Sequence, residues 1–232
     1  MKRRIVLLLL ASLFVLGCVS SAFAATGFID VSKRAWYYKP VMWAADQGIT
    51  NGVDKTHFEP NGPCTRAQFV TFLWRDANCP KIDQKEFDVI MEHAYDDAKN
   101  KSAYYAMAMA WATKVGIVHG SSDENGRPVF CPNACITRAE AATMLWRALD
   151  GPCLASNGCD IDYKDVPADS YYSYAVRWLT NCKVVNGTGK GMFSPNKFCT
   201  RAEMATMLYR AAEEQHLGGK ASDGFIPFAR GN

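Results

Sequence analysis

Three arginines recur in one short motif, Thr-Arg-Ala followed by Gln or Glu, and they are the side chains of this sequence best suited to bind an anion. They are Arg66, Arg138 and Arg201. A guanidinium presents a planar fork of N–H donors that matches a carboxylate. Each arginine stands at the first position of an expected helix, where the helix dipole disfavours a cation by about 0.3–1 kcal/mol. We therefore expect an anion beside each of them.

Two kinds of anion fit this expectation. One is the aspartate near the start of the same repeat, which is Asp30, Asp97 or Asp165. The other is a ligand carboxylate, held by the guanidinium and by free N–H groups of the helix N-terminus. The three arginines, together with Asp30 and Asp165, are therefore candidate ligand contacts.

Aromatic and amide side chains also repeat and could contact a ligand. Trp36, Tyr104 and Tyr171 precede the first helix of each unit, where they could stack on a ligand ring or pack into the core. Asn51 and Asn186 each precede a glycine, so they shape a turn, and their amides could also bind ligand hydroxyls. Trp36, Tyr171, Asn51 and Asn186 complete the set of candidate ligand contacts.

The sequence carries no signature of catalysis or metal binding. It has no H-E-x-x-H, G-x-S-x-G or P-loop pattern, and its four histidines are scattered. Asp160, Asp162 and Asp165 resemble half of a calcium loop but lack its glycine and terminal glutamate. We therefore expect a protein that is not an enzyme and needs no cofactor.

Three copies of one unit position these residues. Residues 28–75 align without a gap on residues 163–210, at a constant offset of 135. The middle copy opens at an offset of 67 and reaches 72 at its Thr-Arg-Ala-Glu motif, because a longer loop at 121–128 intervenes. Internal repeats of this kind indicate units that bury their apolar faces against each other.

Each copy is expected to form a helix, a loop and a second helix. In the first copy, Tyr37, Val41, Ala44 and Ala45 make an amphipathic stripe. The second helix begins at a threonine with Gln or Glu three residues later, which is a capping box. We also expect a short strand at each Phe/Tyr-x-Asp opening. The predicted fold class is all-α, with three helix-loop-helix repeats packed as a pseudo-threefold, three-lobed body. The predicted domains are a signal peptide at 1–24, repeats at 28–80, 95–150 and 163–212, and a flexible tail at 213–232.

The N-terminus predicts export. A basic start, an apolar run over 5–19 and Ala22-Phe23-Ala24 are typical of a secretory signal peptide. An alternative is lipoprotein processing at Cys18. Loss of Lys2, Arg3 and Arg4 leaves 26 − 3 = 23 basic residues against 23 acidic ones. This balance gives no reason to expect a nucleic-acid partner, and no membrane span is expected after cleavage.

Eight cysteines stay in the exported chain, an even number that favours disulfides. Cys182 and Cys199 flank the loop between the helices of the third copy, and Cys153 and Cys159 could close a small loop between copies. These two pairs are the disulfide candidates, although eight cysteines allow 105 connectivities.

The residues now described resemble the S-layer homology repeat. The resemblance rests on Phe-Ile-Asp-Val at 28–31, the aromatic pair Trp36-Tyr37, Gly-Ile-Thr-Asn-Gly at 48–52, Phe-x-Pro and Thr-Arg-Ala-Glu. It covers residues 28–76, 95–148 and 163–212. It implies grooves between repeats that bind a secondary cell-wall polymer, often through pyruvylated sugars. The middle copy departs from the pattern at Ala98, at Ala103 or Tyr104 and in its longer loop, which puts its groove in doubt.

The leading hypothesis is therefore a secreted, non-catalytic module that anchors to a bacterial cell-wall polysaccharide. The alternative is a surface-layer or protein–protein assembly scaffold that self-associates without binding polysaccharide. Retention on purified polysaccharide distinguishes the two.

Overall fold

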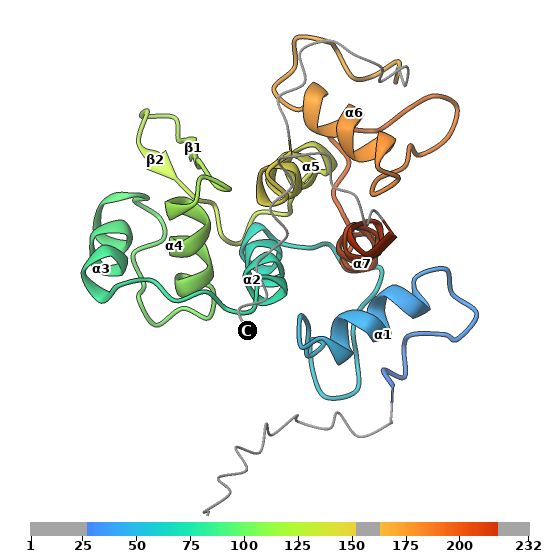
Figure 1. The fold of residues 1–232 in the computed structure, drawn as a ribbon. Coiled ribbons are helices and arrows are strands. Elements are labelled where there is room, and N and C mark those ends of the chain that lie inside the picture. Colours follow the sequence, from blue (N-terminus) through green and yellow to red (C-terminus); the bar gives the residue numbers. More distant parts are fainter. Residues whose placement is uncertain (1–26, 152–162, 218–232) are drawn as a thin grey trace, which may run out of the picture.

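The structure is a computed structural model that describes residues 27–151 and 163–217 (Figure 1). These residues form seven helices and one short hairpin. The helices are α1 (Tyr38–Asp46), α2 (Arg66–Asp76), α3 (Gln84–His93), α4 (Ala106–Lys114), α5 (Arg138–Ala148), α6 (Ser173–Asn181) and α7 (Arg201–Leu217), and the antiparallel hairpin is β1 (Ser121–Ser122) with β2 (Pro128–Val129). The all-α prediction is confirmed, with the helix pairs α1/α2, α4/α5 and α6/α7 formed by the three copies.

Four local features differ from the sequence prediction. The hairpin lies in the longer loop of the middle copy, and in the described ranges the Phe/Tyr-x-Asp openings are turns rather than strands. An additional helix, α3, forms in the segment after the first copy. The Asp83 carboxylate caps its N-terminus, and Phe87 and Met91, one turn apart, are buried. Helix α7 continues to Leu217, five residues past the predicted repeat boundary at 212.

The second helix of every copy begins with the predicted capping box. In α2, the Gln68 N–H donates to Thr65 Oγ1 (3.2 Å) and the Thr65 N–H donates back to Gln68 Oε1 (3.1 Å). Thr137 with Glu140 and Thr200 with Glu203 repeat the exchange. Each box satisfies two of the N–H groups that a helix N-terminus would otherwise leave unpaired.

The residues just before these caps join the three copies in a closed ring. The Cys64 N–H donates to the Cys199 carbonyl, the Ile136 N–H to the Cys64 carbonyl, and the Cys199 N–H to the Ile136 carbonyl, each at 2.9 Å. All three side chains are fully buried. The ring fixes the N-termini of α2, α5 and α7 against each other, although they lie far apart in the sequence.

Burial in this ring decides the state of its cysteines. Cys199 is a free thiol enclosed in the core, so the predicted Cys182–Cys199 disulfide is not formed. Burial also raises the pKa of the Cys64 thiol to about 12. The second predicted disulfide, between Cys153 and Cys159, lies outside the described residues and stays a prediction.

Each copy completes its core with a helix of its neighbour. Helix α4 packs on α2, α6 packs on α5, and α1 packs on α7 (Figure 1). The first helix of a copy thus lies on the second helix of the preceding copy, and the first described helix meets the last. No copy encloses its apolar residues alone, as expected for packed repeats.

The aspartate at each opening holds the Phe-x-Pro loop of its own copy. Asp165 accepts from the backbone N–H groups of Phe193 and Ser194, both at 2.7 Å. Asp30 and Asp97 make the same pair of bonds in the other two copies. The expected ion pair between aspartate and arginine is therefore replaced by bonds to the backbone. These bonds hold Ser194 in the left-handed region, at φ 59°.

The Asp165 bonds lead to a stability prediction. Asp165→Ala should lower the free energy of unfolding by about 2–4 kcal/mol, because two part-buried N–H groups lose a charged acceptor. Urea unfolding followed by tryptophan fluorescence measures this loss. Asp169→Ala, in the exposed turn of the same copy, is the control and should change stability by less than about 0.5 kcal/mol. Equal losses in the two variants would show that the carboxylate does not hold the loop.

Candidate ligand-binding grooves

Among the described residues, grooves of about 400, 400 and 310 Å³ are each built from all three copies. We name each groove after the copy that supplies its Gln or Glu cap. The preceding copy in the cyclic order supplies the motif arginine, and the following copy supplies an aromatic ring. The repeat-1 groove contains Asn51, Gln68, Arg75, Tyr104 and Arg201. The repeat-2 groove contains Arg66, His119, Glu140, Arg147 and Tyr171. The repeat-3 groove contains Trp36, Arg138, Asn186, Lys197, Glu203 and Arg210.

The motif arginines lie at the base of these grooves and are almost fully buried. Arg66, Arg138 and Arg201 expose only 6, 4 and 3% of their surface. The Nε–H groups donate to backbone carbonyls of the neighbouring copy, those of Phe130, Phe193 and Phe58, at 2.7, 2.8 and 2.7 Å. Each guanidinium also lies over the ring of the same phenylalanine, 4.5–5.5 Å from its centroid. All three arginines therefore hold adjacent copies together.

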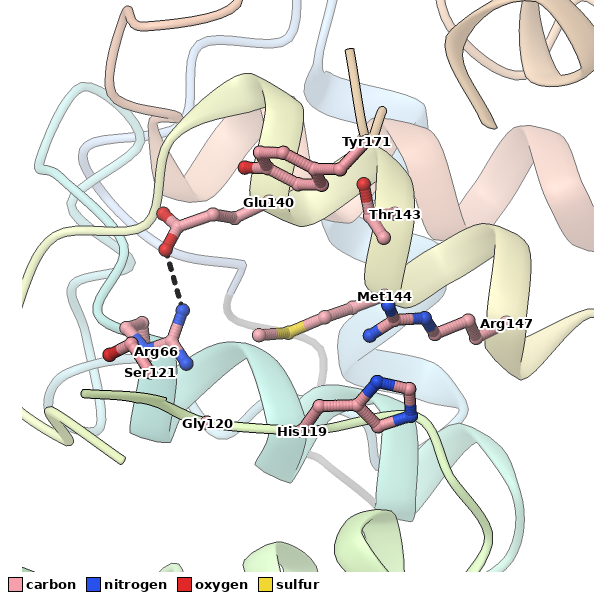
Figure 2. Close-up of a pocket in the computed structure, with 9 residues that line it drawn as sticks. All are labelled: Arg66, His119, Gly120, Ser121, Glu140, Thr143, Met144, Arg147 and Tyr171. Atoms are coloured by element: carbon pink, nitrogen blue, oxygen red, sulfur yellow. Dashed lines mark hydrogen bonds and ion pairs between the residues drawn. The ribbon is translucent and has the colours of Figure 1, made fainter. Parts of the chain in front are cut away.

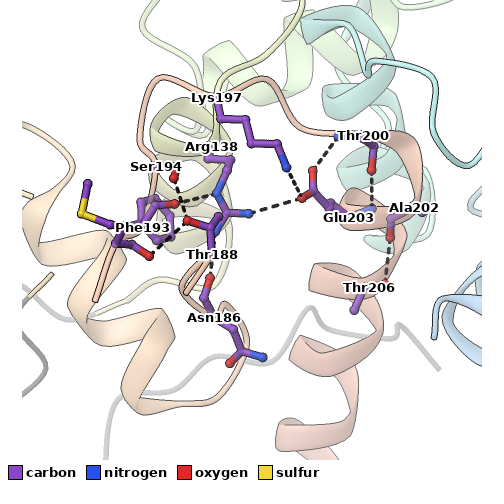
Figure 3. Close-up of polar contacts among 11 residues, drawn as sticks. Arg138, Asn186, Thr188, Phe193, Ser194, Lys197, Thr200, Ala202, Glu203 and Thr206 are labelled. Carbon is purple, nitrogen blue, oxygen red and sulfur yellow. Dashed lines mark hydrogen bonds and ion pairs between the residues drawn. The ribbon is translucent and has the colours of Figure 1, made fainter. Parts of the chain in front are cut away.

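The anion beside two of these arginines is a glutamate of the adjacent copy. Arg66 Nη1 and Glu140 Oε1 are 2.6 Å apart, and Figure 2 shows the two side chains facing each other. Arg138 Nη1 lies 3.7 Å from Glu203 Oε1, and its Nη2 donates to the Asn186 carbonyl at 2.8 Å (Figure 3). The predicted compensating anion is thus present, but it comes from the capping glutamate rather than from the aspartate.

The helix N-termini offer no free N–H groups to a ligand at their first two positions. In α2 the N–H groups of Arg66 and Ala67 donate to the carbonyls of Ala134 and Pro132, both at 3.0 Å. The first two N–H groups of α5 and α7 bind carbonyls of a neighbouring copy in the same way. The expectation that these groups assist a ligand carboxylate is therefore wrong, because contacts between copies already use them.

Three aromatic rings stand exposed at the grooves. Trp36, Tyr104 and Tyr171 expose 63, 64 and 66% of their surface. Each packs edge-on against the following tyrosine, with ring centroids 5.0–5.3 Å apart. The rings therefore do not pack into the core, which was one of the two possibilities left by the sequence, and stacking on a ligand stays a prediction. Among the other candidates, Asn51 and Asn186 line grooves, whereas Asp30 and Asp165 are not among the residues that line the three grooves described above.

The family model of the S-layer homology domain matches residues 27–70, 94–142 and 162–205. These three segments cover more than half of the sequence and agree with the three copies. The chain belongs to the S-layer homology domain family. The resemblance inferred from the repeated motifs is thus confirmed.

Similar S-layer homology segments occur in longer bacterial proteins. The Surface-layer 125 kDa protein of Lysinibacillus sphaericus is 36% identical over 123 residues, which is 53% of this chain and 10% of that protein. Exoglucanase XynX of Acetivibrio thermocellus is 28% identical over 198 residues, 82% of this chain and 16% of the enzyme. The Cellulosome-anchoring protein of Acetivibrio thermocellus is 33% identical over 87 residues, 37% of this chain and 20% of that protein. The chain thus spans about a tenth to a fifth of the length of these curated relatives.

The family and these relatives support a secreted protein of the bacterial cell surface, in agreement with the localisation predicted from the sequence. A search of the described residues for a helix long and apolar enough to span a bilayer finds none.

Sequence reasoning missed part of the S-layer homology grooves. Arg75, Arg147 and Arg210 are not among the candidate contacts predicted from the sequence, yet each lines a groove. Arg75 Nη1 and Arg147 Nη1 donate to the carbonyls of Ile49 and Ile117, both at 3.2 Å, and burial lowers the pKa of Arg147. Their signal was present, because each arginine follows a motif arginine by nine residues in all three copies.

Proposed function

We propose that the protein is a non-catalytic cell-envelope module that attaches to a cell-wall polysaccharide through its grooves. The observation that carries the proposal is the exposed ring that each groove sets beside buried guanidinium groups. Large aromatic rings that stay exposed in a folded protein commonly mark a binding surface. A sugar stacked on such a ring would place its polar groups toward arginine and asparagine donors.

The relatives support attachment as the purpose of this binding. One is named a surface-layer protein and another a cellulosome-anchoring protein. The residues that line the grooves favour binding over catalysis, because the capping glutamates are held in bonds rather than available as acid or base. Glu140, for example, accepts from the Thr137 N–H at 2.8 Å while it pairs with Arg66. A wall polymer with pyruvylated sugars, the ligand implied by the resemblance, would suit the arginine-rich grooves.

A sedimentation assay with purified sacculi tests the proposal. The wild type should co-sediment with sacculi that carry their polysaccharide and stay in solution with stripped sacculi. Replacing Trp36, Tyr104 and Tyr171 together by Ala should weaken binding by about tenfold or more, since each lost stacking contact contributes about 0.5–1.5 kcal/mol. The exposed rings can be removed without opening the core.

Tyr174→Ala is the matched control, because Tyr174 is 51% exposed and lies on α6 rather than among the groove residues. It should bind as the wild type does. If the wild type co-sediments with neither sacculus preparation and instead forms oligomers as its concentration rises, the repeats are an assembly scaffold and the proposal is wrong.

A further inference from the structure

The three grooves differ at one position that faces the motif arginine. The cap residue is Glu140 in the repeat-2 groove and Glu203 in the repeat-3 groove, but it is Gln68 in the repeat-1 groove. The two glutamates lie beside Arg66 and Arg138, at 2.6 and 3.7 Å. The corresponding neighbour of Arg201 is therefore uncharged.

The capping geometry fixes which end of Gln68 is presented to the groove. Gln68 Oε1 accepts from the Thr65 N–H at 3.1 Å, the same bond that one oxygen of Glu140 makes to Thr137. The second oxygen of Glu140 is the one that binds an arginine. The corresponding atom of Gln68 is its amide nitrogen, so the repeat-1 groove has a donor where the repeat-2 groove has an acceptor.

Among the described residues Arg201 makes no ion pair of the kind that Arg66 and Arg138 make, although the Glu59 and Asp30 carboxylates lie near enough to act on its charge. Its Nε donates to the Phe58 carbonyl, but its Nη2 is buried and has no hydrogen-bond partner among the residues that the structure describes. The guanidinium lies near the rings of Phe58 and Phe72, 4.7 and 5.7 Å from their centroids. A buried donor without a partner costs about 1–3 kcal/mol, and more when it is charged. Burial accordingly lowers the pKa of Arg201.

The rest of the repeat-1 groove adds positive charge and no acid. Its lining includes a second guanidinium, that of Arg75, and the residues that line it contain no carboxylate. The other two grooves each contain a glutamate that already occupies the place of a ligand anion. An anion in the repeat-1 groove would meet donors from Arg201 and from the Gln68 amide, a match for the oxygens of a carboxylate or phosphate.

We propose that the repeat-1 groove is the anion-selective groove of this protein, that it takes the carboxylate or phosphate group of an acidic sugar, and that Gln68 is the residue that determines this selectivity. The proposal rests on the proposed function and adds that the three grooves are not equivalent. The repeat-2 and repeat-3 grooves, with their own glutamates, contribute contacts to uncharged parts of the polymer.

NMR titration of the arginine Nε–H signals tests the proposal with three probes: D-glucuronate, D-glucose 6-phosphate and methyl α-D-glucoside. The Arg201 signal should shift with an anionic probe and not with the neutral one, while the Arg66 and Arg138 signals stay in place. The first two probes distinguish a carboxylate from a phosphate ligand. Gln68→Glu should weaken anion binding at least tenfold, because its carboxylate fills the ligand position.

Two further measurements show whether lost anion binding in Gln68→Glu comes from the new carboxylate or from unfolding. Gln68→Glu should be at least as stable as the wild type in urea, since the new carboxylate gives Arg201 a partner, so lost binding cannot be ascribed to unfolding. Glu203→Gln is the matched reverse change. It removes the carboxylate beside Arg138 and Lys197 and should make the Arg138 signal respond to the anionic probe.

The proposal is overturned if Arg201 responds to neither anionic probe, if all three arginines respond equally, or if Gln68→Glu binds as tightly as the wild type. The sacculi assay separates this failure from that of the proposed function. If the wild type and Gln68→Glu are retained equally on polysaccharide-bearing sacculi, only the proposed selectivity of the repeat-1 groove is wrong. If the wild type is not retained on these sacculi, the proposed attachment to the polysaccharide is wrong as well.

Discussion

Arg66→Met should lower the free energy of unfolding by about 2–4 kcal/mol. The substitution leaves the part-buried Glu140 carboxylate without its ion pair and the Phe130 carbonyl without its donor. Removing one partner of a buried pair costs more than the pair itself contributes, because the other partner stays in place without compensation. Equilibrium urea unfolding, with the slope checked for two-state behaviour, measures the change.

Arg201→Met is the informative comparison for this prediction. The same contact to a phenylalanine carbonyl is lost, but no carboxylate is left behind, and the unpaired Nη2 group disappears. We expect a loss of about 1 kcal/mol or less, the usual contribution of a single hydrogen bond. Losses of equal size in Arg66→Met and Arg201→Met would contradict the assignment of Glu140 as the compensating anion.

Gly52→Ala should destabilise the protein by about 3 kcal/mol and deform the repeat-1 groove. A Cβ atom at this position would lie 2.4 Å from the His57 carbonyl oxygen, 2.6 Å from the Asp54 carbonyl oxygen and 2.6 Å from Phe28 Cε1. Backbone oxygens and a buried ring cannot yield as the end of a flexible side chain would. Strain from the left-handed φ of 79° adds to this overlap.

Gly48→Ala separates the effect of atomic overlap from that of left-handed backbone strain. Gly48 has nearly the same φ, 72°, but no heavy atom beyond its own residue and its chain neighbours lies within 4 Å of the Cβ position. It should therefore cost only about 1–2 kcal/mol, the strain of the left-handed conformation alone. Thermal unfolding compares the two variants, and the NMR probes report whether the groove is lost. A Gly52→Ala protein as stable as Gly48→Ala would show that the loop can move away.

The sequence by itself determined the local structure of this protein. The capping boxes depend on residues three positions apart, and the helices on an apolar period of about 3.6 residues, so both could be inferred without knowing the packing. The motif repeated in triplicate identified the family for the same reason. Helix α3 also has a local signal in the sequence, its Asp83 cap followed by Phe87 and Met91.

The tertiary structure alone decided the partners of the motif arginines. Arg201 donates to the carbonyl of Phe58, 143 residues earlier in the chain, and Arg66 to that of Phe130, 64 residues later. Which copy an arginine meets depends on the cyclic order in which the copies close, and no local pattern encodes that order. The same holds for the exposure of Trp36, which depends on what the neighbouring copy leaves uncovered. In the sequence, Gln68 is only an exchange of Gln for Glu within a capping box, and the role proposed for it depends on packing that brings the buried Arg201, with its unpartnered Nη2, into the same groove.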